Sequence, residues 1–188
     1  MQDFIIVTYF ISLTILFIFG SSGFVMIYYY LKHRNTRIPK AGVLTEFPLV
    51  TMQLPVYNEF YVVERLIDAV CRIKYPKELL EIQVLDDSTD ETVDVVAAIV
   101  AAKRAEGFDI HHIRRSSRAG YKAGALKEGL ASCRGEFVAI FDADFIPKPG
   151  FLLETLPYFS DGKIGLVQTR WEHLNRAYSF LTRVQAMA

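Results

Sequence analysis

The chain has 188 residues, 52% of them hydrophobic, and its 21 basic side chains balance its 21 acidic ones. A net charge of zero gives no indication of nucleic-acid binding, and the length leaves room for about one domain. The two cysteines, Cys71 in one predicted helix and Cys133 just after another, have no metal-binding spacing, which favours reduced thiols that fill the core in a reducing compartment.

The first element is an apolar segment at residues 4–31, which carries no charged side chain. About 20 apolar residues suffice for a helix to cross a bilayer, so we predict a transmembrane helix. A basic juxtamembrane linker at residues 32–47 follows. Positive residues favour the cytoplasmic side, which predicts an integral membrane protein of the plasma, inner or Golgi membrane, in contact with lipid, with its N-terminus outside and the remainder in the cytoplasm. A cleaved signal peptide is the alternative, since residues 20–23 are small, but its apolar core would span only about 7–15 residues and follow a basic stretch.

Residues 48–188 alternate apolar runs with amphipathic stretches. Strands are predicted at residues 49–54, 82–85, 109–113, 137–141 and 164–168, and helices at residues 59–73, 92–103, 121–131, 151–159 and 177–188. This order predicts an α/β domain, a mostly parallel sheet with helices on both faces, whose strands are continuously apolar because both faces are buried. The last helix has no terminating signal, so we expect the domain to be C-terminally incomplete.

Two carboxylates, Asp142 and Asp144, follow the predicted strand at residues 137–141. Side chains two positions apart in an extended segment point the same way, so both carboxylates can face one bound group. Such hard oxygen ligands suit Mg²⁺ or Mn²⁺ held together with substrate phosphates, and the ion would neutralise a diphosphate leaving group. A loop turn with capping aspartates is the alternative.

A second acidic pair, Asp86 and Asp87, follows the predicted strand at residues 82–85. One of these carboxylates can accept the N3–H of a uracil or the N1–H of a guanine. Capping of the next helix is the alternative, and we assign that role to Asp90.

The segment at residues 118–126 opens a helix, and a helix N-terminus favours anions. Gly120 and Gly124 allow close backbone approach, and Lys122 adds a positive charge for phosphate. A turn with solvated basic residues is the alternative. Neither a P-loop nor a Gly-x-Gly-x-x-Gly motif occurs in the chain.

Two further features are weaker. His111 and His112 are adjacent on a predicted strand and point to opposite faces, so we do not expect them to share a zinc ion. Trp171, next to Arg170, either stacks on a sugar or belongs to the core.

Taken together, these motifs resemble the family 2 glycosyltransferases, which have the GT-A (Rossmann-like) fold, over about residues 48–188. The matching segments are residues 55–59, 84–90, 118–126 and 141–145, and residues 167–175 are similar to the cellulose synthase-like and (gluco)mannan synthase-like branch. The resemblance implies inverting transfer of a hexose from a UDP- or GDP-sugar donor to a growing β-linked polysaccharide acceptor.

The resemblance also implies which residues form the site. The metal ligands are Asp142 and Asp144, and the nucleotide-sugar-binding residues are Pro55, Tyr57, Asn58, Glu59, Asp86, Asp87, Arg118, Lys122 and Asp142.

Two motifs of that family are not found in this chain. The Thr-Glu-Asp motif that carries the catalytic base is missing, and residues 168–171 have one intervening residue too few for Gln-x-x-Arg-Trp. We therefore expect the base beyond Ala188 and expect this chain alone to be inactive. The alternatives are a nucleotidyltransferase, which a membrane anchor disfavours, and a non-catalytic, truncated nucleotide-sugar-binding membrane protein.

Overall fold

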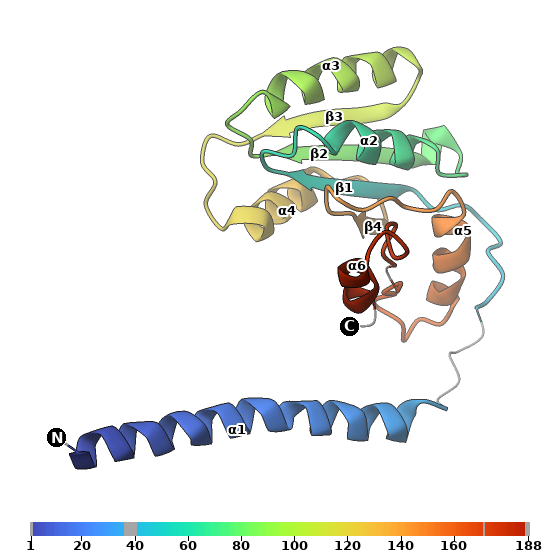
Figure 1. Ribbon diagram of the computed structural model, residues 1–188. Helices are drawn as coiled ribbons and strands as arrows, with labels where there is room; N and C mark the ends of the chain where they lie inside the picture. Colours follow the sequence, from blue (N-terminus) through green and yellow to red (C-terminus); the bar gives the residue numbers. More distant parts are fainter. Residues whose placement is uncertain (1, 36–40, 171, 187–188) are drawn as a thin grey trace. The chain divides into compact units, whose positions relative to one another are not determined.

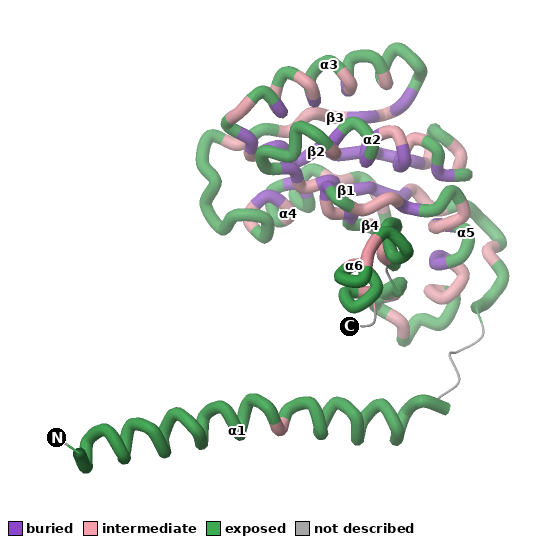
Figure 2. Tube along the Cα trace, in the orientation of Figure 1, coloured by how far each residue is buried: buried purple, intermediate pink, exposed green. Residues whose placement is uncertain are grey.

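The computed structural model describes residues 2–35, 41–170 and 172–186, and the chain divides into two compact units at residues 40 and 41. The first unit contains helix α1 (Gln2–His33), which has no buried residue. Figure 2 shows it exposed along almost its whole length. By length and composition, α1 is able to cross a membrane, although a signal sequence would have the same properties.

The second unit is built on a four-stranded, fully parallel sheet in the order β3-β2-β1-β4 (Figure 1). Its strands are β1 (Val50–Val56), β2 (Leu80–Asp86), β3 (Asp109–Arg114) and β4 (Phe137–Ile140). In the register of the sheet, Asp86 lies opposite both Val56 and Arg114, so β1, β2 and β3 end together. The predicted α/β architecture is confirmed.

Helices alternate with the strands, as the sequence indicates. They are α2 (Val63–Cys71), the short 3-10 helix η1 (Lys77–Leu79), α3 (Thr92–Ala105), α4 (Tyr121–Ser132), α5 (Phe151–Thr155), the 3-10 helix η2 (Leu156–Ser160) and α6 (Phe180–Gln185).

The two faces of the sheet differ in chemistry. On one face, alternate strand residues such as Met52, Leu54 and Ile82 form the hydrophobic core together with apolar side chains of α2 and α3. The opposite face is also buried, but it carries polar side chains, namely Thr51, Gln53, Glu81 and Gln83. The expectation of continuously apolar strands is therefore wrong, because these polar groups satisfy one another by hydrogen bonding.

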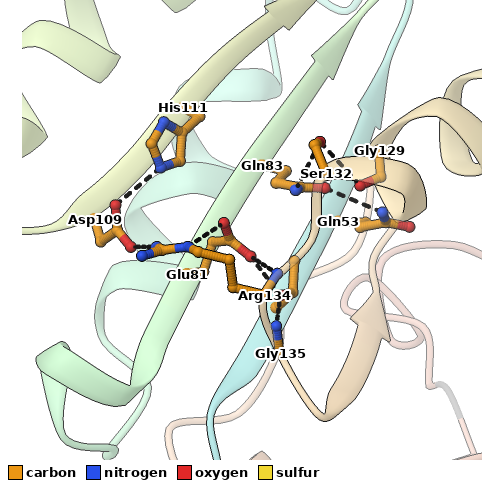
Figure 3. A network of polar contacts seen from close by, with 10 residues as sticks. Gln53, Glu81, Gln83, Asp109, His111, Gly129, Ser132, Arg134 and Gly135 are labelled. Atoms are coloured by element: carbon orange, nitrogen blue, oxygen red, sulfur yellow. Dashed lines mark hydrogen bonds and ion pairs between the residues drawn. The ribbon is translucent and has the colours of Figure 1, made fainter.

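Helix α4 covers part of the polar face, and Gly129 makes this close contact possible. A Cβ atom at that position would lie 2.7 Å from the Gln53 side-chain nitrogen and 2.8 Å from a Leu85 methyl group. Gln53 Nε2 also lies 3.1 Å from Gln83 Oε1 (both residues are labelled in Figure 3), so the buried amides pair beneath the helix.

Several predicted boundaries are wrong. Residues 164–168 form a mostly exposed irregular segment instead of a strand, since apolar periodicity cannot show whether a pairing partner is available. The predicted helix at residues 151–159 is α5 followed by η2, because Pro157 has no N–H to continue the α-helix. The helix expected at residues 59–73 begins only at Val63. Where a helix was expected at residues 177–188, the described residues, which extend to 186, form only α6.

Both cysteines lie in the second unit. Burial raises the pKa of the Cys71 thiol to about 11, so this half-buried cysteine is neutral and fills space, as predicted. Cys133 follows α4 and is also half-buried.

The end of the predicted linker contacts the second unit. The N–H of Gly42 donates to the carbonyl of Pro157 (3.0 Å), and Leu44 packs against the core.

Candidate functional site

The loops that follow β1 and β2 are tied together by Asn58. Its backbone N–H donates to Oγ of Ser88 (2.9 Å), and its side-chain oxygen accepts the N–H of Thr89 (2.9 Å). Asn58 has a left-handed backbone with φ of 55°, which asparagine tolerates because its short side chain can hydrogen-bond locally. The N–H of Asp87 adds a bond to the Val56 carbonyl (3.0 Å), so the two loops form one unit.

Asp86, predicted to contact the nucleotide, has a fully buried carboxylate. One oxygen lies 2.8 Å from Nε2 of His112, and the other accepts the N–H of Ser88 (2.8 Å). Burial alone would raise the pKa of Asp86, but the hydrogen bonds from His112 and Ser88 outweigh it and hold the pKa below its usual value. The carboxylate is therefore ionised and engaged inside the protein, which makes it a support for the loop.

Asp87 is paired with Arg115, which is not among the predicted nucleotide-sugar-binding residues. The guanidinium donates to both carboxylate oxygens, and both side chains are at most 7% exposed. Arg115 also donates to the carbonyls of Ala119 (2.9 Å) and Tyr121 (3.0 Å), so it connects Asp87 to the start of α4. Its position directly after β3 was the available signal, since that strand end adjoins the acidic pair.

Tyr57 and Arg118 are also brought together. The guanidinium carbon of Arg118 lies 3.3 Å from the centre of the Tyr57 ring and 5.1 Å from that of Tyr121. Gly120 and Tyr121 both have positive φ, 72° and 50°, so the chain enters α4 through a left-handed turn. Such backbone strain gathers at binding sites, where it fixes the positions of the groups around a ligand.

Lys122, in the first turn of α4, forms an ion pair with Asp142 beyond β4. Both side chains remain about half exposed. The ion pair therefore brings together the lysine predicted to bind phosphate and an aspartate predicted to bind the metal ion. Screening by solvent keeps such an exposed pair weak, so a ligand can exchange it at little cost.

Asp142 and Asp144 do not lie in an extended segment. The prediction that side-chain alternation in a strand points both carboxylates the same way is therefore wrong. β4 ends at Ile140, and the N–H of Phe145 donates to the carbonyl of Asp142 (3.0 Å), closing a turn. Asp144 is exposed and has no ion-pair partner among residues 2–35, 41–170 and 172–186. The donor set still fits a hard cation, since both groups are accessible carboxylates on one tight turn.

The other predicted residues lie at the same edge. Pro55 is the partly exposed penultimate residue of β1, and the Glu59 carbonyl accepts the N–H groups of Val62 and Val63 at the start of α2. The Asp90 side chain accepts the Thr92 N–H (3.0 Å), but the N-cap position of α3 is Glu91, so Asp90 supports the helix start from one residue before the cap and the predicted capping role is wrong. We call the loops at residues 57–59, 86–90, 115–122 and 142–144 the carboxyl-edge site.

A second polar cluster lies where the strands begin. Glu81, Asp109 and His111 place one ligand atom each within 4.8 Å of one another, a spacing that can hold a metal ion. Arg134 already forms ion pairs with Glu81 and with Asp109, and His111 Nε2 lies 2.9 Å from Asp109 (Figure 3). We call these four residues the amino-edge network. A dication there would have to displace a guanidinium, which disfavours a metal ion at this network.

The two adjacent histidines have different partners, as expected. His111 contacts Asp109, whereas His112 contacts Asp86. Trp171, for which stacking on a sugar and burial in the core were both open, lies outside the described residues, and the neighbouring Arg170 is exposed.

The sequence of this chain is similar to those of known glycosyltransferases. The family model described as glycosyl transferase family 2 matches residues 53–185, which is most of the second unit. Among curated proteins, a probable glucomannan 4-beta-mannosyltransferase 7 of Oryza sativa subsp. japonica is 46% identical over 147 residues, covering 76% of this chain and 25% of the relative. The glucomannan 4-beta-mannosyltransferase 2 of Arabidopsis thaliana is 44% identical over 149 residues, covering 77% and 28%. The chain thus spans about a quarter of the length of these relatives.

Solved structures agree on the fold. The mannosyltransferase PcManGT of Pyrobaculum calidifontis, in complex with GDP-Man and Mn²⁺, is similar with a TM-score of 0.65 and 29% identity, over 78% of this chain and 43% of that one. S. aureus TarS, residues 1–349 in complex with UDP, has a TM-score of 0.53 at 19% identity, over 65% and 38%, and supports the fold alone.

Proposed function

This chain belongs to glycosyl transferase family 2, and we propose that the complete protein transfers mannose from GDP-mannose to a β-linked polysaccharide acceptor at a membrane. The observation that carries this proposal is the similarity to glucomannan 4-beta-mannosyltransferases, 44–46% identical over the segment that contains the carboxyl-edge site. The structural neighbour in complex with GDP-Man and Mn²⁺ supports the same donor and a divalent ion.

The nucleotide would lie over the joined loops after β1 and β2. Tyr57 supplies an aromatic face already stacked with Arg118, and Asn58 fixes the loop in its left-handed turn. Asp87 is the better candidate to accept a base N–H, because the carboxylate of Asp86 is fully engaged within the protein. Two arginine bonds still leave carboxylate lone pairs for a further donor.

The diphosphate would lie between the start of α4 and the Asp142/Asp144 turn. Lys122 supplies a flexible cation, and the amino end of α4 favours an anion. Asp142 and Asp144 are the residues that would hold Mg²⁺ or Mn²⁺, which would neutralise charge on the departing nucleoside diphosphate. When a nucleotide-sugar donor binds, its phosphates can pair with Lys122 in place of Asp142. The carboxylate of Asp142 would then be free to bind the ion.

Transfer also requires a base that deprotonates the acceptor hydroxyl. We propose that this base lies beyond Ala188, and that Pro55 and Glu59 shape the donor side of the site only. Helix α1 would anchor the enzyme in lipid with the carboxyl-edge site in the cytoplasm. The basic residues in the last turn of α1 and just after it, such as Lys32 and Arg34, support this orientation.

Membranes containing the complete protein test the proposal when they are supplied with a panel of GDP- and UDP-sugars, with Mg²⁺, Mn²⁺ or a chelator. We expect mannose from GDP-mannose to enter a polymer that a β-mannanase digests, with release of GDP and dependence on the divalent ion. Release of pyrophosphate would instead indicate a nucleotidyltransferase. Nucleotide binding without any transfer would indicate the non-catalytic alternative.

A further inference from the structure

We propose that His112 is a positioning residue for the donor pocket, acting through the buried carboxylate of Asp86 and the loop that it holds. The proposal rests on the proposed function for its kinetic test, but its structural test is independent of any substrate. His112 is not among the predicted nucleotide-sugar-binding or metal-binding residues.

The first step is the contact between His112 and Asp86. His112 lies in β3, opposite Val84 of β2, and its side chain is only 16% exposed. Its Nε2 is 2.8 Å from an oxygen of Asp86, whose side chain has no exposed surface. An ionised carboxylate only accepts hydrogen bonds, so Nε2 must carry the proton in this contact.

The second step leads from Asp86 to the loops. The other carboxylate oxygen accepts the N–H of Ser88, and Ser88 Oγ accepts the N–H of Asn58. The carbonyl of Ser88 is held by Arg114 (2.9 Å), and Asn58 in turn accepts the N–H of Thr89. A continuous chain of hydrogen bonds therefore connects a histidine in β3 to the loops that carry Tyr57, Asn58 and Asp87.

The third step concerns what would hold Asp86 without His112. Among the described residues, Arg114 is the other cation near it, but its Nε lies 3.9 Å away on a half-exposed side chain. A buried carboxylate that loses a donor either takes up a proton or turns toward solvent. Either change weakens its bond to Ser88 and loosens the two loops, whereas the ion pair of Lys122 with Asp142 involves neither Asp86 nor Ser88.

This mechanism predicts a particular kinetic result. A looser pocket raises the KM for the donor, whereas kcat changes little because the groups around the leaving diphosphate stay in place. A histidine that merely filled the core would lower stability without separating KM from kcat.

The test compares His112→Gln with His112→Asn in the complete membrane protein. The Gln side chain can place an N–H near the position of Nε2, whereas Asn is too short to reach Asp86. We expect His112→Asn to raise the KM for GDP-mannose about tenfold, as for the loss of one hydrogen bond to a charged group, with kcat within twofold. His112→Gln should restore KM to within about threefold of the wild type. His111→Asn is the matched control, since that neighbouring histidine contacts Asp109, and it should leave both constants unchanged.

Amide hydrogen exchange provides the second measurement, without any substrate. In His112→Asn, the amides of Asn58, Ser88 and Thr89 should exchange faster than in the wild type, and in His112→Gln they should not. If the wild type fails to use GDP-mannose, the proposed function fails, and this exchange pattern still decides the role of His112. An unchanged KM in the transferring enzyme, or exchange in these loops that is the same in both variants, would overturn the inference.

Discussion

The carboxyl-edge site and the amino-edge network lie at opposite edges of the same parallel sheet, and both combine acids with bases. In the amino-edge network, Arg134 neutralises both carboxylates, and the buried Glu81 also accepts a bond from Thr51 (2.5 Å). In the carboxyl-edge site, Asp144 is exposed without an ion-pair partner within the described part of the chain.

The backbone conformation also distinguishes the two clusters. The described non-glycine residues with positive φ, Asn58 and Tyr121, both belong to the carboxyl-edge site. Strain and unpaired charge together are the signs of a binding site, whereas a closed set of ion pairs is the sign of a structural tie. A metal-like spacing of side chains is by itself too weak to separate these two roles.

The largest effect should come from Asp144→Ala in the complete protein. Removing a carboxylate that would hold the divalent ion should lower mannosyl transfer at least about 100-fold, in line with the loss of one preorganised charge-stabilising group. Transfer rates across a series of Mn²⁺ concentrations measure this loss. Asp94→Ala, which removes an exposed acid from the first turn of α3, is the control and should transfer normally. Unchanged activity of Asp144→Ala with the same metal requirement would refute the assignment.

The converse change is Glu81→Gln, which should affect stability instead of transfer. Loss of charge at this buried residue weakens its bonds to Arg134 and Thr51, at a cost of about 2 kcal/mol. For a domain of this size, the unfolding temperature should fall by about 4–8 °C, measured on the detergent-solubilised protein. The KM for GDP-mannose should stay within twofold. A raised KM with an unchanged unfolding temperature would show that the amino-edge network takes part in donor binding.

Much of the fold follows from the sequence because its signals are local. The alternating apolar runs predicted all four strands of the sheet, and the Asp-Asp and Asp-Ala-Asp segments stand at strand ends as expected. The failures depend on partners that are distant along the chain. Residues 164–168 have a strand-like pattern without a paired neighbour, and the polar side chains within β1 and β2 are buried because they satisfy one another.

The site was less predictable for the same reason. Arg115 and His112 act by contacting Asp87 and Asp86, which are about 26–28 residues away along the chain. No short motif reports such contacts, since they arise only when β3 pairs with β2. The roles of Asp86 and Asp87 also differ by burial, which their adjacent positions in the sequence conceal.

Low pH should destabilise the fold through both clusters, because each contains a buried carboxylate with a lowered pKa. Burial would raise the pKa of Glu81, but the hydrogen bonds from Arg134 and Thr51 hold it below its usual value, as His112 and Ser88 do for Asp86. Each group therefore stabilises the fold fully above the unfolded-state pKa near 4, and this contribution is lost as the pH falls through the folded-state pKa. The unfolding temperature should decline from about pH 5 downward, less steeply in Glu81→Gln and in Asp86→Asn than in the wild type. Asp94→Asn should keep the full slope, and equal slopes in all four proteins would contradict this account.

The smallest effect should come from His111→Ala, which removes the one nitrogen ligand from the metal-like triad of Glu81, Asp109 and His111. If that triad held the ion needed for transfer, the Mn²⁺ concentration for half-maximal activity would rise about 10–100-fold. We expect a change of less than twofold, because Arg134 already pairs with the two carboxylates and the proposed metal ligands are Asp142 and Asp144. A Mn²⁺ titration of transfer decides between the two edges of the sheet, with Asp144→Ala measured alongside. A large shift in His111→Ala would move the metal site to the amino-edge network and invalidate the distinction drawn from charge pairing.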